Sequence, residues 1–263
     1  MKYTNMLNKT FVIFPILIAL LLFVFAGTAS AQLTATANHD HITVDFFYHG
    51  STISVRGVSD PGTDLIIKVT SEDGNQTLRK KGKVGGFLWM NVGELEVEHV
   101  PKVYFLHSTR NIDDILSRDE MNKNVIGYPA LEKYVKMNTT DEAEKDRWFN
   151  EFVKFKESSN VYATSTGKIS LMDKDSEQNY YILTEWPYQA PPGKYTVTVY
   201  AVKDKKVVET ATSNVLVEQV GMVKSFANMA KNNAAVYGLI AILAALTAGF
   251  GVGLVFRKNG GAH

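Results

Sequence analysis

The sequence predicts a mainly β protein: an immunoglobulin-like β-sandwich with a helical insert, followed by one C-terminal transmembrane helix. Short segments of alternating apolar and polar residues recur between residues 42 and 107 and again after residue 168. Segments of this kind, spaced by roughly ten residues and separated by turn signals, are typical of β-sandwiches. A helical pattern occupies residues 111–158, and residues 234–256 carry no charge.

The first alternating segment begins at Ile42, and every second residue from there to Phe46 is apolar. Period-two alternation indicates a half-buried strand. Asp73-Gly74 is a hairpin signal, so we expect the preceding strand to return along residues 76–80. Gly85-Gly86 predicts a sharp bend or a bulge before the aromatic segment that follows.

The end of the sandwich carries a strong strand signal. Tyr195 to Val202 is a run of β-forming residues, and residues 207–220 return after a charged turn. The pattern P-x-G-x-Y-x-V, which begins at Pro191, is common at the close of immunoglobulin-like sandwiches. We therefore predict one sandwich over residues 32–220, with two small domains as the alternative.

The insert at residues 111–158 contains a clear amphipathic helix. Thr139 and Glu142 have the spacing of a capping box, which marks the start of a helix. Aromatic residues then recur at three- and four-residue steps, with charged residues on the other face. Because these charges are of both signs, we expect the stripe to cover the β-domain and not a membrane surface or a partner. The stripe consists of Trp148, Phe149, Phe152 and Phe155.

Residues 1–31 have the pattern of a secretory signal peptide. Lys2 and Lys9 precede fifteen apolar residues, Phe11 to Phe25, a run too short for a membrane span of ~20 residues. An A-x-A pattern ending at Ala31 follows, as at a signal cleavage site. An uncleaved anchor is the alternative.

The second apolar run, residues 234–256, is long enough to cross a bilayer core of ~30 Å. Arg257 and Lys258 follow it directly. Since positive charge stays on the cytoplasmic side, we expect residues 257–263 to be a cytoplasmic tail and residues 32–233 to lie outside. Residues 221–233 are predicted as a juxtamembrane helix.

Small residues recur at every fourth position of the predicted span. Such a stripe lets two helix backbones approach closely in lipid. We therefore predict that it packs against a partner helix, from a second copy of the chain or from another integral membrane protein. The stripe consists of Ala241, Ala245, Gly249 and Gly253.

Composition excludes several classes of function. Residues 32–233 carry all 27 acids but 24 of the 28 bases, a net charge of −3, which argues against nucleic-acid binding. The absence of cysteine excludes disulfides and thiol chemistry. HExxH, GxSxG and P-loop motifs are also absent, so we predict no cofactor and no enzymatic activity. An enzyme would need isolated carboxylates such as Glu94 or Asp113.

Two segments contain residues that bind metals in other proteins. Asp173, Asp175 and Glu177 resemble the start of a calcium loop, but the glycine and acid expected later in such a loop are missing. We interpret them as a solvated turn. His39 and His41 lie on one side of a predicted strand, and we expect exposed polar residues there and not a metal site.

The densest cluster of positive charge is a candidate contact surface. It could meet anions or lipid headgroups, or it could be an edge strand that lysines protect from aggregation. We extend it by three polar or aromatic residues nearby in the sequence. The complete candidate surface is Arg79, Lys80, Lys81, Lys83, Trp89, Asn91 and Arg110.

The same residues carry a resemblance to a known family. The run Arg79-Lys80-Lys81, Trp89-x-Asn91 and Val100-Pro101-x-x-Tyr104 resemble the alphaproteobacterial putative transmembrane protein family, as do Tyr195-Thr196-Val197 and the Arg257-Lys258 stop. The resemblance covers most of residues 35–258 and includes no catalytic signature.

The resemblance implies a bacterial inner-membrane protein with a periplasmic N-terminal domain. Members of the family are encoded near permeases of the sulfite-exporter type, which implies a non-catalytic accessory protein of a membrane transporter. The alternative is an extracytoplasmic sensor of an anion or other ligand, with a pocket among Arg79, Arg110 and Trp89.

Overall fold

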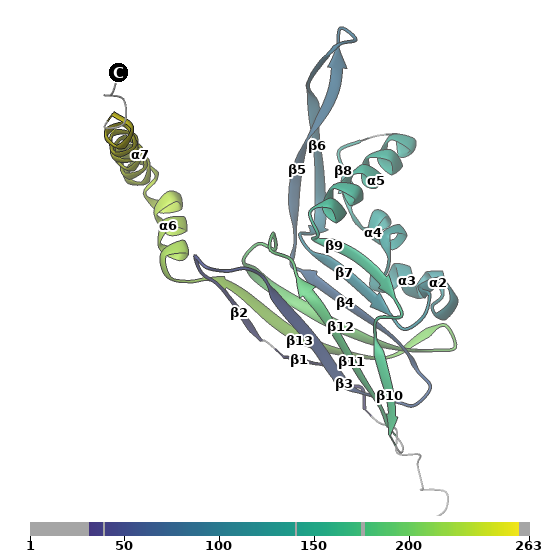
Figure 1. Cartoon of the computed structure of the whole chain (residues 1–263). Helices are drawn as coiled ribbons and strands as arrows, with labels where there is room; N and C mark the ends of the chain where they lie inside the picture. Colours follow the sequence, from purple (N-terminus) through teal and green to yellow (C-terminus); the bar gives the residue numbers. More distant parts are fainter. Residues whose placement is uncertain (1–31, 39, 140, 175–176, 258–263) are drawn as a thin grey trace, which may run out of the picture. The chain divides into compact units, whose positions relative to one another are not determined.

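The computed structural model describes residues 32–38, 40–139, 141–174 and 177–257 (Figure 1). Over these residues the chain is mainly β and ends in an apolar helix, which confirms the predicted fold class. The predicted signal peptide and residues 258–263 of the predicted tail lie outside the described residues.

The first sheet has four strands, and all neighbouring strands in it are antiparallel. Their order is β1-β3-β11-β10. The strands are β1 (Thr36–Ala37), β3 (Ser51–Ser59), β11 (Glu177–Trp186) and β10 (Ser170–Lys174).

The second sheet has six strands in the order β2-β13-β12-β4-β7-β9. Its four inner strands are antiparallel, and the two edge pairs, β2 with β13 and β7 with β9, are parallel. The strands are β2 (His41–Val44), β13 (Lys206–Gln219), β12 (Gly193–Lys203), β4 (Asp64–Ser71), β7 (Tyr104–Ser108) and β9 (Tyr162–Thr166).

One hydrophobic core joins the two sheets. The ring of Trp186, at the end of β11, meets the ring of Tyr195 on β12 edge to face, with centroids 4.6 Å apart. The central strands supply fully buried side chains to this core, and in β4 and β12 consecutive residues are buried. The fully buried side chains include Ile53, Val55, Leu65, Ile67, Val197 and Val199.

A long hairpin forms the third sheet and projects from the other two (Figure 1). It consists of β5 (Asp73–Val84) and β6 (Leu88–Pro101), with the short strand β8 (Lys136–Met137) beside the base of β6. The predicted hairpin at Asp73-Gly74 is wrong, because these residues begin β5. The turn is made by Gly85-Gly86, whose φ angles of 64° and 82° favour glycine.

Helices occupy most of residues 112–158, where the sequence predicts a helical insert. They are α2 (Ile112–Ile115), α3 (Arg118–Asn124), α4 (Tyr128–Tyr134) and α5 (Glu142–Ser158). The hydroxyl of Tyr104 on β7 accepts a hydrogen bond from the Gly127 amide and donates one to the Val125 carbonyl. The helices are thereby fixed to the second sheet.

The stripe of α5 packs on the β-domain, as predicted. Phe149 and Phe152 are buried, and the Phe152 ring meets the Tyr162 ring of β9 edge to face at 5.8 Å. Phe155 is 52% exposed and lies outside this contact. Asp141, and not Thr139, caps the helix, because its carboxylate accepts from the Ala143 amide.

Two helices end the described chain: α6 (Gly221–Asn232) and α7 (Ala234–Arg257). At 1.5 Å per residue the 24 residues of α7 extend about 36 Å. Residues 234–254 have a mean hydropathy of 2.1, and none of this segment is buried in the protein. By length and composition α7 is the one helix in the described part of the chain that can cross a membrane.

Candidate interaction surface

The hairpin tip, defined here as residues 81–92, brings together four of the predicted surface residues. Lys81 lies directly opposite Asn91, and Lys83 directly opposite Trp89. Residues opposite each other in an antiparallel pair point to the same face. The Lys83 ammonium sits over the Trp89 ring, 5.4 Å from its centroid. One face of the tip is therefore basic and aromatic.

The opposite face of the tip is apolar. Val84 lies opposite Leu88, and Gly82 lies opposite Met90. A Cβ atom at Gly82 would come within 2.9 Å of a methyl group of Val92, so the glycine leaves room for that valine. This face therefore consists of small and large apolar residues, and no other part of the described chain covers it.

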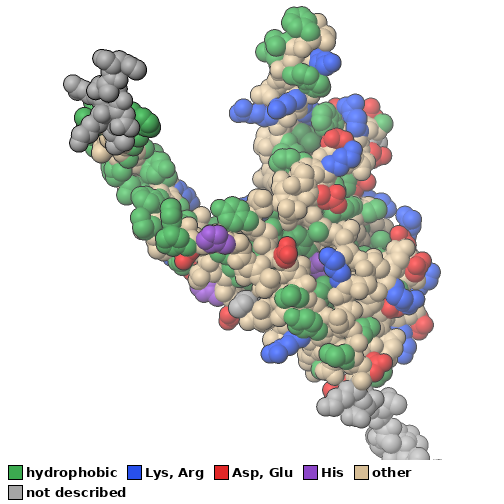
Figure 2. All heavy atoms as spheres, in the orientation of Figure 1, with side chains coloured by type: hydrophobic (Ala, Val, Ile, Leu, Met, Phe, Trp, Pro, Cys, Tyr) green, Lys and Arg blue, Asp and Glu red, His purple; other side chains and the backbone are tan. Residues whose placement is uncertain are grey.

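The tip exposes an unusual share of apolar side chains. Phe87 is 82% exposed and Trp89 is 64% exposed. Single exposed apolar residues are common on soluble proteins, but six within twelve residues mark an interaction site or an aggregation hazard. Figure 2 shows these side chains on the projecting hairpin beside blue Lys and Arg side chains. The six are Val84, Phe87, Leu88, Trp89, Met90 and Val92.

The charge of the hairpin is of one sign. No acid occurs between Asp73 and Glu94, whereas four Lys and Arg residues occur there. Lys80 is not part of the exposed surface. Its ammonium lies 3.5 Å from a carboxylate oxygen of Glu144 and 4.8 Å from the centroid of the Trp148 ring, both on α5. Lys80 thus attaches the hairpin base to α5.

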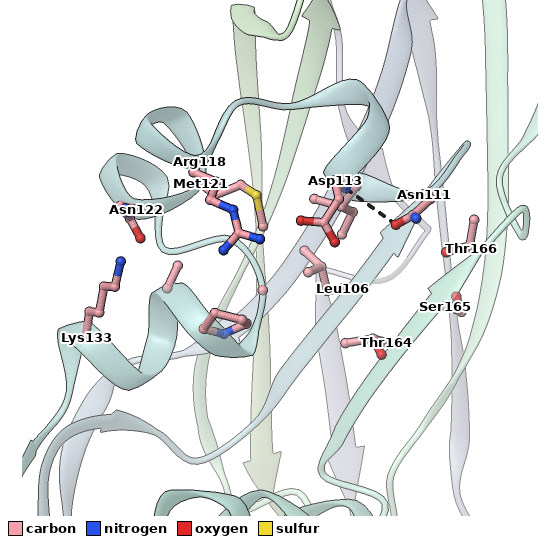
Figure 3. A pocket seen from close by; sticks show the side chains of 14 residues that line it. Leu106, Asn111, Asp113, Arg118, Met121, Asn122, Lys133, Thr164, Ser165 and Thr166 are labelled. Atoms are coloured by element: carbon pink, nitrogen blue, oxygen red, sulfur yellow. Dashed lines mark hydrogen bonds between the residues drawn. The ribbon is translucent and has the colours of Figure 1, made fainter. Parts of the chain in front are cut away.

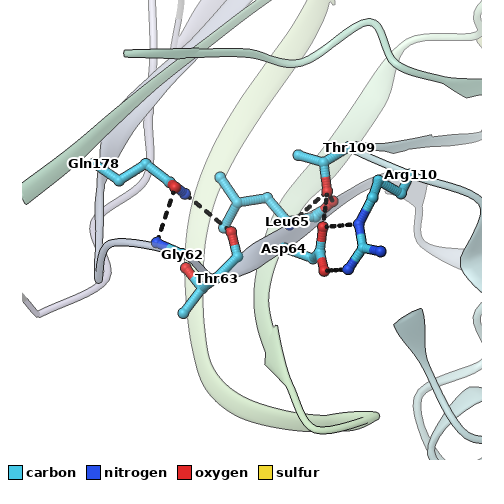
Figure 4. Close-up of polar contacts among 7 residues, drawn as sticks. All are labelled: Gly62, Thr63, Asp64, Leu65, Thr109, Arg110 and Gln178. Carbon is cyan, nitrogen blue, oxygen red and sulfur yellow. Dashed lines mark hydrogen bonds and ion pairs between the residues drawn. The ribbon is translucent and has the colours of Figure 1, made fainter. Parts of the chain in front are cut away.

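Arg79 lies opposite Glu94 and shares a face with Lys81 by strand alternation. Arg110 lies elsewhere. Its guanidinium binds the Asp64 carboxylate through two nitrogens, with Nε 2.8 Å from Oδ1 (Figure 4). The hydrogen bond from Arg110 holds the pKa of Asp64 below its usual range.

Asp64 begins β4, whereas the hairpin follows the end of that strand at Ser71. Arg110 therefore lies at the far end of β4 from Arg79 and Trp89. None of these three residues lines the pocket beside Asp113, the groove beside His107 or the pocket beside Lys156. The structure therefore does not bring Arg110 together with Arg79 and Trp89, as the sensor hypothesis requires.

The two isolated carboxylates lie apart. Asp113 lines a pocket of about 270 Å³ between the α2–α4 helices and strands β7 and β9 (Figure 3). Arg118 and Lys133 line it too, and Asp113 is its one acidic residue. Glu94 is on the hairpin and does not line this pocket.

The candidate metal-binding residues do not gather. Within the described ranges no three His, Asp or Glu side chains form a group that could hold a metal ion. His41 Nε2 lies 3.3 Å from a carboxylate oxygen of Glu218. Asp173 and Glu177 flank the β10–β11 turn, while His39 and Asp175 lie outside the described residues.

Two buried polar residues were not singled out from the sequence. His107 is 3% exposed, and its Nδ1 lies 2.6 Å from Ser165 Oγ across the β7–β9 pair. Burial first, and Lys168 second, lower the pKa of His107 to about 4. His107 and Ser165 line an open groove of about 1330 Å³.

The second is Lys156 on α5, which is 7% exposed. The sequence does contain a signal for it, because Lys156 stands four residues after Phe152, on the apolar stripe. A lysine on the buried face of an amphipathic helix departs from the pattern of apolar residues there and marks the position in the sequence.

The small-residue stripe of α7 has no partner within the described chain. Positions 241, 245, 249 and 253 are exposed, and nothing lies within 4 Å of a Cβ atom built at Gly249 or Gly253. The stripe is open along the helix, and its packing against another helix stays a prediction.

Fold and surface together define a membrane-anchored, β-rich protein with one projecting, apolar hairpin. The model of the putative transmembrane protein family (Alph_Pro_TM) matches residues 32–258, and the chain belongs to this family. The resemblance found in the sequence is thereby confirmed. A search of curated proteins finds no match for the chain.

Proposed function

We propose that the protein is a non-catalytic accessory module, anchored in the inner membrane of a bacterium, whose hairpin tip binds an integral membrane protein. The observation that carries the proposal is the exposed hairpin tip, half of whose residues are large and apolar. A soluble protein gains nothing in stability from such residues, because they bury little area within its own fold.

The charge pattern of the chain supports a periplasmic position for the hairpin. Arg257 and Lys258 follow the span, and such residues stay on the cytoplasmic side. Residues 1–31 have the pattern of an export signal. A partner in the same membrane meets the tip at a high effective concentration, because both molecules are confined to one bilayer.

The strand order supports an immunoglobulin-like sandwich as the scaffold. With β1, β3, β4, β10, β11, β12 and β13 taken as strands A, B, C, D, E, F and G, the sheets read A-B-E-D and G-F-C. Tyr195, near the start of β12, donates its hydroxyl hydrogen bond to the Pro191 carbonyl, as in the tyrosine corner of such domains. These domains commonly serve as rigid supports for binding loops.

Photo-cross-linking from the tip tests the proposal. A photoreactive phenylalanine replaces Trp89 in one variant and Phe47, an exposed ring outside the hairpin, in the matched control. After irradiation of native membranes and mild detergent extraction, we expect a multi-span permease linked to the Trp89 position and not to the Phe47 position. Links to a second copy of the chain alone, or equal links from both positions, would contradict the proposal.

A sensor of an anion or other ligand is the second candidate function. Because the structure separates Arg79 and Trp89 from Arg110, this function requires a ligand pocket other than the predicted one. A pocket of about 320 Å³ beside the buried Lys156 favours it.

A further inference from the structure

The last turn of α5 buries a lysine against the base of the hairpin. Lys156 is 7% exposed, and no ion pair to a carboxylate joins it within the described residues. Lysine is almost never buried unless a negative charge pairs with it, because removing an ammonium group from water is costly. This position therefore requires an explanation.

The groups around Lys156 stabilise its ammonium only in part. It donates a hydrogen bond to the side-chain oxygen of Gln76 on β5. The rings of Phe152 and Tyr162 lie 5.3 and 5.7 Å away from it, at cation–π distances. None of these groups carries a full negative charge. Burial first, and Lys102 second, lower the pKa of Lys156 to about 8, so the group is still mostly protonated at neutral pH.

The Gln76 amide has a fixed orientation because an ammonium group only donates hydrogen bonds. Its oxygen faces Lys156, and its nitrogen must point away. That nitrogen is buried and has no hydrogen-bond partner in the described part of the chain. A buried donor without an acceptor is destabilising, because its hydrogen bond to water is lost on burial and not replaced. The site therefore lacks an acceptor as well as a negative charge.

Both residues line a pocket of about 320 Å³ between the hairpin base, the end of α5 and the segment before β12. A second lysine, Lys102, lines it, and no Asp or Glu does. Cations are repelled from such a pocket, and a neutral ligand leaves its charge uncompensated. The remaining lining residues are Phe155, Ser159, Val161, Gln189 and Pro191.

We propose that this pocket binds a compact oxyanion: a phosphate, a sulfate or the carboxylate of a small molecule. The anion supplies the charge that Lys156 and Lys102 lack and accepts hydrogen bonds from their ammonium groups. The inference does not depend on the hairpin tip, because Lys156 and the tip residues lie in different parts of the fold. The anion pocket supports the sensor hypothesis, but its residues are Lys156 and Lys102 and not the predicted Arg79, Arg110 and Trp89.

Calorimetric titration of the full chain in a non-ionic detergent tests the proposal. The probes are sodium sulfate, sodium phosphate and sodium acetate, at ionic strength held constant with chloride. Lys156→Met removes the buried charge at nearly constant volume, and Lys102→Met removes the second charge. Lys154→Met is the matched control, because Lys154 lies on the same helix but is exposed and paired with Glu151.

We expect saturable binding of at least one probe by the wild-type chain and by Lys154→Met. In Lys156→Met the affinity should fall at least tenfold, and in Lys102→Met severalfold. Should Lys156→Met fail to fold, Lys102→Met still decides the matter, because its side chain lies on the surface. No saturable binding of any probe, or equal affinity in the wild type and in both lining variants, would overturn the proposal.

Two further arms separate the sources of the anion and its dependence on pH. Glycerol phosphate and a short-chain phosphatidylglycerol test whether a lipid headgroup supplies the oxyanion, and binding of either supports the same site. Sulfate does not titrate near neutrality, so its affinity should fall above pH 8 as Lys156 loses its proton, with Lys102 and Tyr162 the other titratable groups around it. An affinity that stays constant from pH 7 to pH 9.5 would contradict a role for Lys156.

Discussion

The base and the tip of the hairpin are built from the same two strands, yet they differ in what they bury. At the base, Leu95 and Val97 are 1% and 0% exposed, because they are part of the hydrophobic core. At the tip, Leu88 and Trp89 on the same strand are 51% and 64% exposed. Apolar content alone does not place a residue in a core. The base serves the fold, and the tip is free to serve an interaction.

Leucine truncation should separate the two halves most strongly. Leu95→Ala leaves a cavity in the core and should lower the free energy of unfolding by about 2–5 kcal/mol. Leu88→Ala, the matched change at the tip, should alter it by less than about 0.5 kcal/mol. Denaturant unfolding of the full chain in detergent measures both, and equal losses would show that the tip is also part of the folded core.

Stability at alkaline pH tests the buried charge at the base. The pKa of Lys156 is about 8 in the folded protein and 10.5 in the unfolded chain, so between these values the unfolded state binds more protons. The free energy of unfolding should therefore rise with pH through this window, by at most a few kcal/mol at ~1.4 kcal/mol per pKa unit. Lys156→Met should lose the part of this rise that Lys156 contributes.

Lys68 makes a control for the pH experiment necessary. Burial also lowers its pKa to about 8, so it adds to the same rise. Only the difference between the wild type and Lys156→Met reports on Lys156. Lys154→Met should follow the wild-type curve, and a Lys156→Met curve identical to it would show that Lys156 is not protonated unfavourably in the folded protein.

The attachment of the hairpin to α5 should have a smaller effect. Lys80→Met removes the contact with Glu144 but keeps an apolar chain on the Trp148 ring, so we expect a loss of about 0.5–1 kcal/mol. Lys83→Met at the tip removes a similar contact with Trp89 on an exposed face and should cost less. Hydrogen exchange along β5 and β6 would show whether Lys80 keeps the base closed.

The sequence predicts the helices and strands themselves better than it predicts which strands pair with each other. Alternation in the strands and the aromatic stripe of α5 follow from periods of 2 and 3.6 residues, which local sequence displays directly. The sequence predicts a hairpin turn at Asp73-Gly74 and a bend or bulge at Gly85-Gly86, and only the pairing of β5 with β6 shows that the second is the hairpin turn. Local periodicity does not determine which strands pair over long distances in the sequence.

The candidate surface was predicted in part for the same reason. Lys81, Lys83, Trp89 and Asn91 meet because cross-strand register brings them together. Lys80 and Arg110 leave the set because α5 and Asp64 bind them, and those contacts join residues 64 and 46 positions apart in the sequence. The anion pocket needs Gln76, Lys102 and Lys156, three residues from separate elements that no single motif connects.

The most direct test of the central claim compares folding with binding in one variant. Phe87→Ser, Leu88→Ser and Trp89→Ser are combined in the full chain, purified from native membranes after cross-linking through a C-terminal tag. We expect a midpoint of thermal unfolding close to that of the wild type, together with loss of the co-purifying permease. An unchanged yield of the permease would contradict the proposal that the hairpin tip is the contact surface.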